Sequence, residues 1–167
     1  MKHLKRASLI LAMVALSACS QNGIGGLTGG QDGAGASNAQ SDASNPTSPA
    51  YFQQSIGDRV FFAVDQATVD ASAQAALNAQ ADWLIQNPEY KVIIEGHADE
   101  RGTRDYNLAL GARRAGSVRE YLTVRGVSAD RIQTVSYGKE RPAEVCSAES
   151  CYAMNRRGVT VLSNLSF

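Results

Sequence analysis

The sequence predicts an α/β protein, a two-layer α+β domain in which helices pack on a small mixed sheet of about four strands. One observation is that short apolar runs, typical of strands, alternate with longer segments whose apolar residues recur at helical spacing. A second is that these segments fill one continuous stretch of ordinary domain size, residues 51–167, with no visible internal repeat. Alternation of this kind favours helices packed on a sheet that contains both parallel and antiparallel strands.

Each expected element has its own signal in the sequence. Four short runs rich in β-branched or aromatic residues are predicted as strands: residues 59–64, 91–95, 132–137 and 159–163. An alanine-rich segment with helical spacing, residues 69–86, is predicted as a helix that ends before Pro88. A second helix is expected at residues 104–124, closed by Arg125 and Gly126, and a helical turn at residues 153–157.

The helix expected at residues 104–124 carries a core face with two polar residues beside it. On a wheel of roughly 100° per residue, the predicted core face consists of Leu108, Gly111, Ala115, Val118 and Leu122. Asn107 and Arg114 are seven residues apart, so they point in nearly the same direction. They lie at one margin of the core face, where we expect them to be half covered.

The first residues have the composition of an export signal. Three basic residues precede an apolar stretch, residues 9–16, that is too short to span a bilayer as a helix. The stretch leads into Leu16-Ser17-Ala18-Cys19, which resembles the lipobox of bacterial lipoproteins. That resemblance implies a signal peptide at residues 1–18 and lipidation of Cys19; an ordinary secretory signal with a chance cysteine is the alternative. Ser20 stands where an aspartate would favour retention in the inner membrane, and so implies an outer-membrane anchor.

Residues 19–50 form the expected tether between the lipid and the domain. They are dominated by Gly, Ala, Ser, Asn, Gln and Asp, which cannot bury enough apolar surface to order themselves. A flexible chain of about 30 residues spans roughly 30 Å on average, which suits an anchor that lets a domain reach another structure. An idle linker is equally compatible with this composition.

The cysteine count favours a disulfide. The chain has three cysteines, and lipidation of Cys19 would leave Cys146 and Cys151. An exported protein lies in an oxidising compartment, which favours a bond between these two. A zinc site would need four ligands, and no second cysteine or histidine pair lies nearby, so neither a metal nor a cofactor is expected.

The charge balance argues against nucleic acid as a partner. Loss of the signal would remove three of the 16 basic residues and none of the 16 acidic ones, leaving a net charge of −3. A mildly acidic exported protein without a basic stripe is a poor nucleic-acid binder.

Polar side chains gather where the second expected strand ends. Asp99 follows the strand at residues 91–95, and Asn107 and Arg114 lie on the next helix. Ligands of open α/β sheets bind outside the carboxyl ends of strands, so we expect these three residues to share a shallow pocket. Arg114 suits a carboxylate, Asp99 an ammonium group and Asn107 either one, which together suit an amino-acid zwitterion. The equally weighted alternative is an internal Asp99–Arg114 salt bridge that steadies the loop.

No catalytic residue is expected. His97 lies beside Asp99 and Glu100 and could suggest a general base. A hydrolase would also need a metal with more ligands, or a nucleophile paired with this histidine. Ser117 and Ser136 have no motif context, so we predict a structural role for His97 and a protein that is not an enzyme.

One long pattern carries a family resemblance. The spacing NxxLxxxRAxxVxxxL, from Asn107 to Leu122, is accompanied by GHADERGT at residues 96–103, SYGKERP at 136–142 and NRR at 155–157. This set resembles the OmpA-like C-terminal domains, and most closely the peptidoglycan-associated lipoproteins of the Tol system. The resemblance covers residues 59–162 and extends to the lipobox and the tether.

The resemblance implies a domain that binds peptidoglycan without catalysis, through the meso-diaminopimelate of the stem peptide. Asp99 would take the ammonium group of that residue and Arg114 its carboxylate, with Asn107 assisting. Asp65 and Arg157 would line the rim of the site.

The resemblance also implies a location and partners. The protein would be lipid-anchored in the outer membrane, with its domain facing the periplasm. The periplasmic β-propeller protein of the Tol system would compete with the wall for an overlapping surface, and other Tol components would join in supporting envelope integrity and constriction at division. A wall-binding subunit of another envelope machine and, less favoured, a peptidoglycan hydrolase are the alternatives.

The sequence departs from the family pattern in two places. Ala63 stands where an acidic residue often follows Phe62, which leaves Asp65 as the only carboxylate of that turn. The loop between Cys146 and Cys151 also differs from the expected one.

Overall fold

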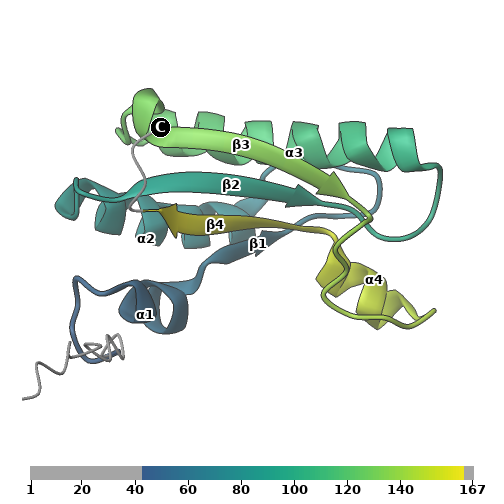
Figure 1. Ribbon diagram of the computed structural model, residues 1–167, viewed down its shortest axis with the longest axis horizontal. Coiled ribbons are helices and arrows are strands. Elements are labelled where there is room, and N and C mark those ends of the chain that lie inside the picture. Colours follow the sequence, from purple (N-terminus) through teal and green to yellow (C-terminus); the bar gives the residue numbers. More distant parts are fainter. Residues whose placement is uncertain (1–42, 164–167) are drawn as a thin grey trace, which may run out of the picture. The chain divides into compact units, whose positions relative to one another are not determined.

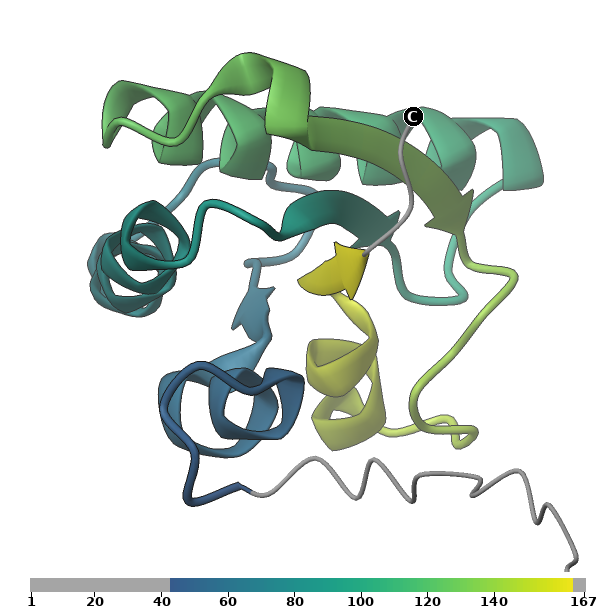
Figure 2. The same cartoon turned by 60° about the vertical axis from the view of Figure 1, so that its left-hand side comes forward.

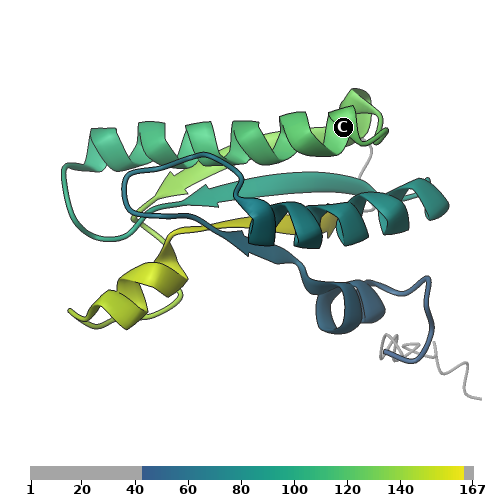
Figure 3. The same ribbon diagram turned by 180° about the vertical axis from the view of Figure 1, so that it is seen from behind.

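The computed structural model describes residues 43–163 and contains a four-stranded sheet with two long helices on one of its faces (Figures 1 and 3). The strands lie in the order β1-β4-β2-β3. Their bounds are Arg59–Phe61 for β1, Lys91–His97 for β2, Ile132–Gly138 for β3 and Arg157–Ser163 for β4. β2 pairs in parallel with β3, and β4 pairs antiparallel with both β1 and β2. The predicted mixed sheet of four strands is confirmed.

The two long helices are α2 (Ala71–Gln86) and α3 (Arg104–Val124). α3 runs along β2 and β3, and α2 lies toward the β1 side of the same face (Figure 2). Two shorter helices, α1 (Pro49–Tyr51) and α4 (Glu149–Asn155), lie near opposite ends of the sheet (Figure 1). A π-helical turn, Phe52–Gly57, continues α1, and a 3₁₀ turn, Ala129–Arg131, precedes β3. Within residues 43–163, every helix is too short or too polar to cross a membrane.

Several element bounds differ from the expected ones. β1 ends at Phe61 instead of residue 64, because the chain leaves the sheet in a turn where Asp65 has a left-handed φ of 59°. α2 begins at residue 71 because the side chain of Asp70 accepts a hydrogen bond from Ala73 N (2.8 Å) and caps the helix. β4 begins two residues earlier than expected, and the helical turn expected at residues 153–157 is the longer and earlier helix α4.

Folded residues begin before the predicted domain boundary at residue 51. The indole Nε1 of Trp83 donates to the Pro46 carbonyl oxygen (2.7 Å), and the Tyr90 hydroxyl donates to the Thr47 carbonyl oxygen (3.0 Å). Ser48 caps α1 by accepting from Tyr51 N (3.1 Å). These contacts place the last residues of the expected tether on the domain. The predicted signal peptide, the lipidated Cys19 and the rest of the tether lie outside the described residues.

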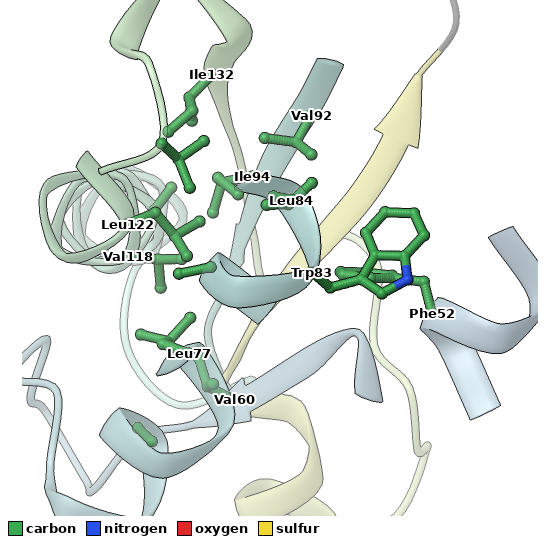
Figure 4. Packing of buried hydrophobic residues seen from close by; sticks show 14 of the residues in the cluster. Phe52, Val60, Leu77, Trp83, Leu84, Val92, Ile94, Val118, Leu122 and Ile132 are labelled. Atoms are coloured by element: carbon green, nitrogen blue, oxygen red, sulfur yellow. The ribbon is translucent and has the colours of Figure 1, made fainter. Parts of the chain in front are cut away.

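The core fills the space between the two long helices and the sheet (Figure 4). α2 contributes Leu77 and Leu84, and α3 contributes Val118 and Leu122, all with 1% exposure or less. Alternate residues of β2, Val92 and Ile94, point into the same cluster. Burial of side chains of this size contributes roughly 1.5–3 kcal/mol each.

The core face of α3 differs from the predicted one at one residue. Gly111, Ala115, Val118 and Leu122 are buried as expected, but Leu108 is 41% exposed and Leu110 is only 5% exposed. The first half of α3 meets β3 through its main chain, since the hydroxyl of Ser136 donates to the carbonyl oxygen of Leu108 (2.6 Å). Leu110 instead lines the pocket described below.

Two glycines let α3 approach β2 closely. A Cβ at Gly96 would lie 1.8 Å from the carbonyl oxygen of Gly111, and a Cβ at Gly111 would lie 2.7 Å from the carbonyl oxygen of Gly96. No larger residue fits either position without movement of the main chain. This contact brings Arg114, one turn further along α3, under the end of β2.

Candidate functional site

A pocket of about 260 Å³ lies where β2 ends and α3 begins. The β1–α2 loop, the β2–α3 loop and α4 gather at this end of the sheet (Figure 3). Polar and charged side chains make up most of the lining, with a few apolar ones: Val64, Asp65, Asp99, Arg101, Gly102, Tyr106, Asn107, Leu110, Arg114 and Arg156. The structure therefore brings together four of the five predicted ligand-binding residues, Asp65, Asp99, Asn107 and Arg114.

Arg114 is held by main-chain carbonyl groups. It is fully buried, and its guanidinium donates to the carbonyl oxygens of Gln66 (2.8 Å), His97 (2.7 Å) and Ala63 (3.2 Å). Burial lowers the pKa of Arg114 to about 10, against the opposing attraction of Asp99, so the side chain is charged at neutral pH. A guanidinium has five N–H donors, and these three bonds use one N–H group on each of its three nitrogens.

Asp99 pairs with two other arginines and not with Arg114, which corrects the alternative of an internal Asp99–Arg114 salt bridge. Its Oδ2 accepts from Arg101 Nη2 (2.7 Å) and from Arg156 Nη1 (3.2 Å). Its Oδ1 accepts from the main-chain N–H of Arg101 (3.2 Å). Burial alone would raise the pKa of Asp99, but the hydrogen bonds from Arg101 and Arg156 hold it below its ordinary value. The carboxylate is therefore ionised at neutral pH.

Asn107 and Asp65 complete the walls of the pocket. Asn107 is 1% exposed, instead of half covered as predicted, and its Nδ2 donates to the Arg101 carbonyl oxygen (2.8 Å). This bond ties the β2–α3 loop to the first turn of α3. Asp65 accepts a hydrogen bond from the hydroxyl of Tyr106 at the open side of the pocket.

Arg157 lies away from the pocket. Its neighbour Arg156 lines the pocket instead, in the position that we predicted for Arg157. The Arg157 guanidinium donates to the carbonyl oxygens of Asn155 (3.4 Å) and Arg141 (3.2 Å). Arg156 instead donates to Asp99, to the Phe62 carbonyl oxygen (3.1 Å) and to Glu149 (2.8 Å). Both arginines belong to one motif, and neighbouring residues at the start of a strand face opposite sides.

Arg101 and Tyr106 also line the pocket, although they are not among the predicted site residues. Arg101 lies within GHADERGT, and Tyr106 directly precedes the pattern that begins at Asn107. Their proximity to Asp99 and Asn107 in the sequence was the available signal.

His97 is buried outside the pocket. Its exposure is 1%, and neither ring nitrogen has a hydrogen-bond partner among the described residues. Burial, followed by the charges of Arg157 and Arg141, lowers the pKa of His97 to about 4, while the main chain of Arg141 opposes this shift without reaching hydrogen-bond geometry. The Glu95 carboxylate lies 3.4 Å from Nε2, but it does not outweigh these effects. The imidazole is therefore neutral at pH 7.

The described residues give His97 no catalytic partner. Ser136 donates its hydroxyl to the Leu108 carbonyl oxygen, and Ser117 donates to the Arg113 carbonyl oxygen (3.1 Å). Residues 43–163 also contain no group of three or more side chains that could hold a metal ion.

The predicted disulfide between Cys146 and Cys151 is present, with a Cα–Cα distance of 5.9 Å. It closes the segment between β3 and α4. The side-chain amide of Asn155 holds the same segment by accepting from Ala143 N (2.7 Å) and Glu144 N (3.0 Å). The disulfide thus closes the loop that differs from the family pattern, and Asn155 holds the residues just before that loop.

Comparisons with known proteins agree on one family. The model of the OmpA family matches residues 61–156. The peptidoglycan-associated lipoprotein of Rhizobium meliloti is 56% identical over 120 residues, which cover 72% of this chain and 68% of the relative. That of Mesorhizobium japonicum is 48% identical over 158 residues, which cover 92% and 89% of the two chains. The crystal structure of the peptidoglycan-associated lipoprotein from Burkholderia pseudomallei is 38% identical, with a TM-score of 0.64 over 72% of this chain and 98% of that one.

Proposed function

Because the chain belongs to the OmpA family and is similar to its peptidoglycan-associated lipoproteins, we propose that it binds peptidoglycan and links the cell wall to the outer membrane. The binding is non-covalent and uses the pocket at the end of β2. The relatives are named for a lipid anchor and for association with the wall, and not for an enzymatic reaction, which agrees with the prediction that the protein is not an enzyme.

The observation that carries the proposal is the pairing of opposite charges within one small pocket. The side chain of meso-diaminopimelate ends in an amino-acid head with one ammonium group and one carboxylate. Asp99 stays ionised and accepts the ammonium group, and the two remaining N–H groups of Arg114 meet the carboxylate in parallel. Asn107 and Asp65 lie close enough to assist, whereas Arg157 is no longer assigned to the rim.

Arg114 is held in place before any ligand binds. Arg114 is fixed by three main-chain carbonyl groups from the loop after β1 and from the end of β2. A side chain that is already ordered loses little conformational entropy when the ligand binds. The same bonds explain why an arginine and not a lysine suits this position, since one ammonium group cannot reach three carbonyl groups and a ligand.

We also propose that the protein is anchored by lipid and acts with the Tol system. Lipidation of Cys19 holds the protein in the outer membrane, since several acyl chains at roughly 0.8 kcal/mol per buried methylene bind firmly. The chain then acts with the Tol system, whose periplasmic β-propeller protein competes with the wall for an overlapping surface. This role supports envelope integrity and constriction at division.

Sedimentation with purified sacculi tests the site. The full chain, purified in mild detergent, is mixed with sacculi, and the bound fraction of the parent is compared with that of Asp99→Asn and Arg114→Lys. Asp82→Asn is the matched control, because Asp82 on α2 pairs with Arg125 (3.3 Å), which follows the last residue of α3 at the opposite end of this helix from the pocket. We expect both site variants to lose at least about tenfold in affinity, as for a buried charge pair that loses one partner, and the control to bind as the parent does.

Four outcomes would count against the proposal. Site variants that sediment as the parent does would show that the pocket is wrongly assigned. A parent chain that fails to bind sacculi would remove the function itself. Release of soluble muropeptides during the incubation would revive the hydrolase alternative. Co-purification from membranes separates the Tol system from other envelope machines, and recovery of a different complex would overturn the Tol assignment.

A further inference from the structure

Glu149 lies just outside the pocket and bonds to the two arginines that hold Asp99. Its Oε1 accepts from Arg156 Nη2 (2.8 Å), and its Oε2 lies 3.4 Å from Arg101 Nη1. Each arginine thus bridges two carboxylates, Asp99 inside the pocket and Glu149 at its edge. This residue is the first of α4, in the segment closed by the disulfide, and the function proposed above gives it no role.

With Glu149 the pocket is electrically balanced. Its lining carries three arginines, Arg101, Arg114 and Arg156, and two carboxylates, Asp65 and Asp99. Glu149 supplies the third carboxylate, so that the charges of the group cancel. A neutral group accepts a zwitterion without a net change in charge, whereas a group with one excess positive charge favours a plain anion.

Arg101 occupies the position that a ligand's ammonium group would take on Asp99. Its side chain is 45% exposed, so solvent reaches it while it pairs with Asp99. Two groups on α4 are already within its reach: the Glu149 carboxylate, and the ring of Tyr152, whose centroid lies 4.6 Å from the Arg101 guanidinium carbon. When an ammonium group displaces Arg101 from Asp99, the guanidinium keeps one carboxylate and one aromatic face.

We propose that Glu149 is a specificity-determining residue of this pocket: by holding Arg101 and Arg156 it makes the site select a ligand that carries ammonium and carboxylate together over one that carries a carboxylate alone. The inference rests on the proposed binding of the diaminopimelate head. Glu149 would act on ligand selection through Arg101 and Arg156, without contacting the ligand itself.

The disulfide places Glu149. The residue before α4, Ala148, offers no side-chain cap, so the seven-residue helix begins without the bond that usually fixes a first turn. The bond from Cys151, inside α4, to Cys146 holds this turn to the segment before it. Reduction of the disulfide should therefore loosen Glu149 and weaken the selectivity, although it changes no charge in the pocket.

Three soluble stem peptides test the choice by isothermal titration calorimetry on the full chain in mild detergent. The first carries meso-diaminopimelate, the second its analogue with hydrogen in place of the distal amine, and the third lysine, which has the ammonium group but no distal carboxylate. Glu149→Gln removes the charge and keeps the shape. Glu144→Gln removes a charge from the same segment but from a side chain that makes no ion pair with a described residue, and is the matched control.

We expect the parent to prefer the zwitterion over both other peptides. In Glu149→Gln the preference for the zwitterion over the carboxylate-only peptide should fall roughly two- to fivefold, the value of one exposed ion pair, and the lysine peptide should bind more weakly. The Cys146→Ser/Cys151→Ser variant should shift the preference in the same direction, and Glu144→Gln should match the parent.

The outcomes separate this inference from the proposed function. A parent that prefers the zwitterion, together with a Glu149→Gln variant that keeps the same preference, overturns the inference alone. An equal shift in Glu144→Gln also overturns it, since the effect would then come from net charge and not from the pairs of Glu149. A parent that binds none of the three peptides overturns both.

Discussion

Acidification should destabilise the protein through a single buried side chain, His97. The side chain is 2% exposed, and its two ring nitrogens have no hydrogen-bond partner among residues 43–163. Four groups face it from the surrounding elements: Glu95 on its own strand, Tyr137 on β3, Arg141 in the following loop and Arg157 on β4. A proton added here would be repelled by two arginines, and only Glu95 and the main chain of Arg141 among these groups oppose that repulsion.

The size of the effect follows from the pKa of His97, which is about 4 in the folded protein against the ordinary value of 6.5. Between these values the unfolded chain binds the proton and the folded chain does not. Stability from this group is therefore complete above pH 6.5 and is lost as the pH falls toward 4. At 1.36 kcal/mol for each pKa unit, the loss reaches about 2.5 kcal/mol at pH 4.5.

Urea denaturation of the parent and of His97→Phe, between pH 7 and pH 4.5, measures this loss. The phenylalanine keeps a ring against Tyr137, whose centroid lies 5.6 Å away, but cannot take up a proton. The free energy of unfolding should fall by about 2.5 kcal/mol more in the parent than in the variant. Asp99 does not interfere, because its lowered pKa moves its own contribution below pH 3.8. Parallel pH profiles for the two proteins would refute the reasoning, as would an imidazole that titrates near pH 6.5 by NMR in the folded chain.

Three further predictions concern stability and are measured by urea denaturation at pH 7. Gly96→Ala should lower the free energy of unfolding by more than about 3 kcal/mol, because its Cβ would lie 1.8 Å from a carbonyl oxygen of α3. Gly116→Ala, whose Cβ would have nothing within 4 Å, should raise the free energy of unfolding by about 0.5–1 kcal/mol. Equal effects of the two substitutions would contradict the close contact between α3 and β2. Arg114→Lys should lower the free energy of unfolding by roughly 2–5 kcal/mol, since one ammonium group leaves at least two buried carbonyl groups unpaired. An unchanged midpoint of urea denaturation would show that these bonds do not stabilise the fold. Reduction of the Cys146–Cys151 bond should cost at most about 2 kcal/mol for so short a loop, and dithiothreitol should leave the double serine variant unaffected.

The sequence predicts the layers of this fold well because its signals are local. The apolar run of β2 and the seven-residue spacing of Asn107 and Arg114 depend only on nearby residues, and the structure places both side chains in one pocket. The left-handed turn at Asp65 has no comparable signal, so β1 was expected to extend beyond Phe61.

The sequence does not predict which side chains pair with each other within the site, because these pairs join residues that are far apart in the sequence. Asp99 and Arg156 are 57 positions apart, and only the order of the strands brings them together. The sequence shows two adjacent arginines without showing which of them faces Asp99. Leu108 and Leu110 pose the same difficulty on α3, since the closeness of the main chain to β3, and not apolar periodicity, decides which of them is covered.

The order of the strands has a consequence for the course of folding. Among residues 43–163, β4 is the last strand in sequence, yet it lies between β1 and β2, and β1 pairs with no other strand. The parallel pair of β2 and β3 can form earlier, but β1 can join only when residues 157–163 are available. Pairing over so long a separation is slow, so we expect the joining of β1 to β4 to be a late step of folding.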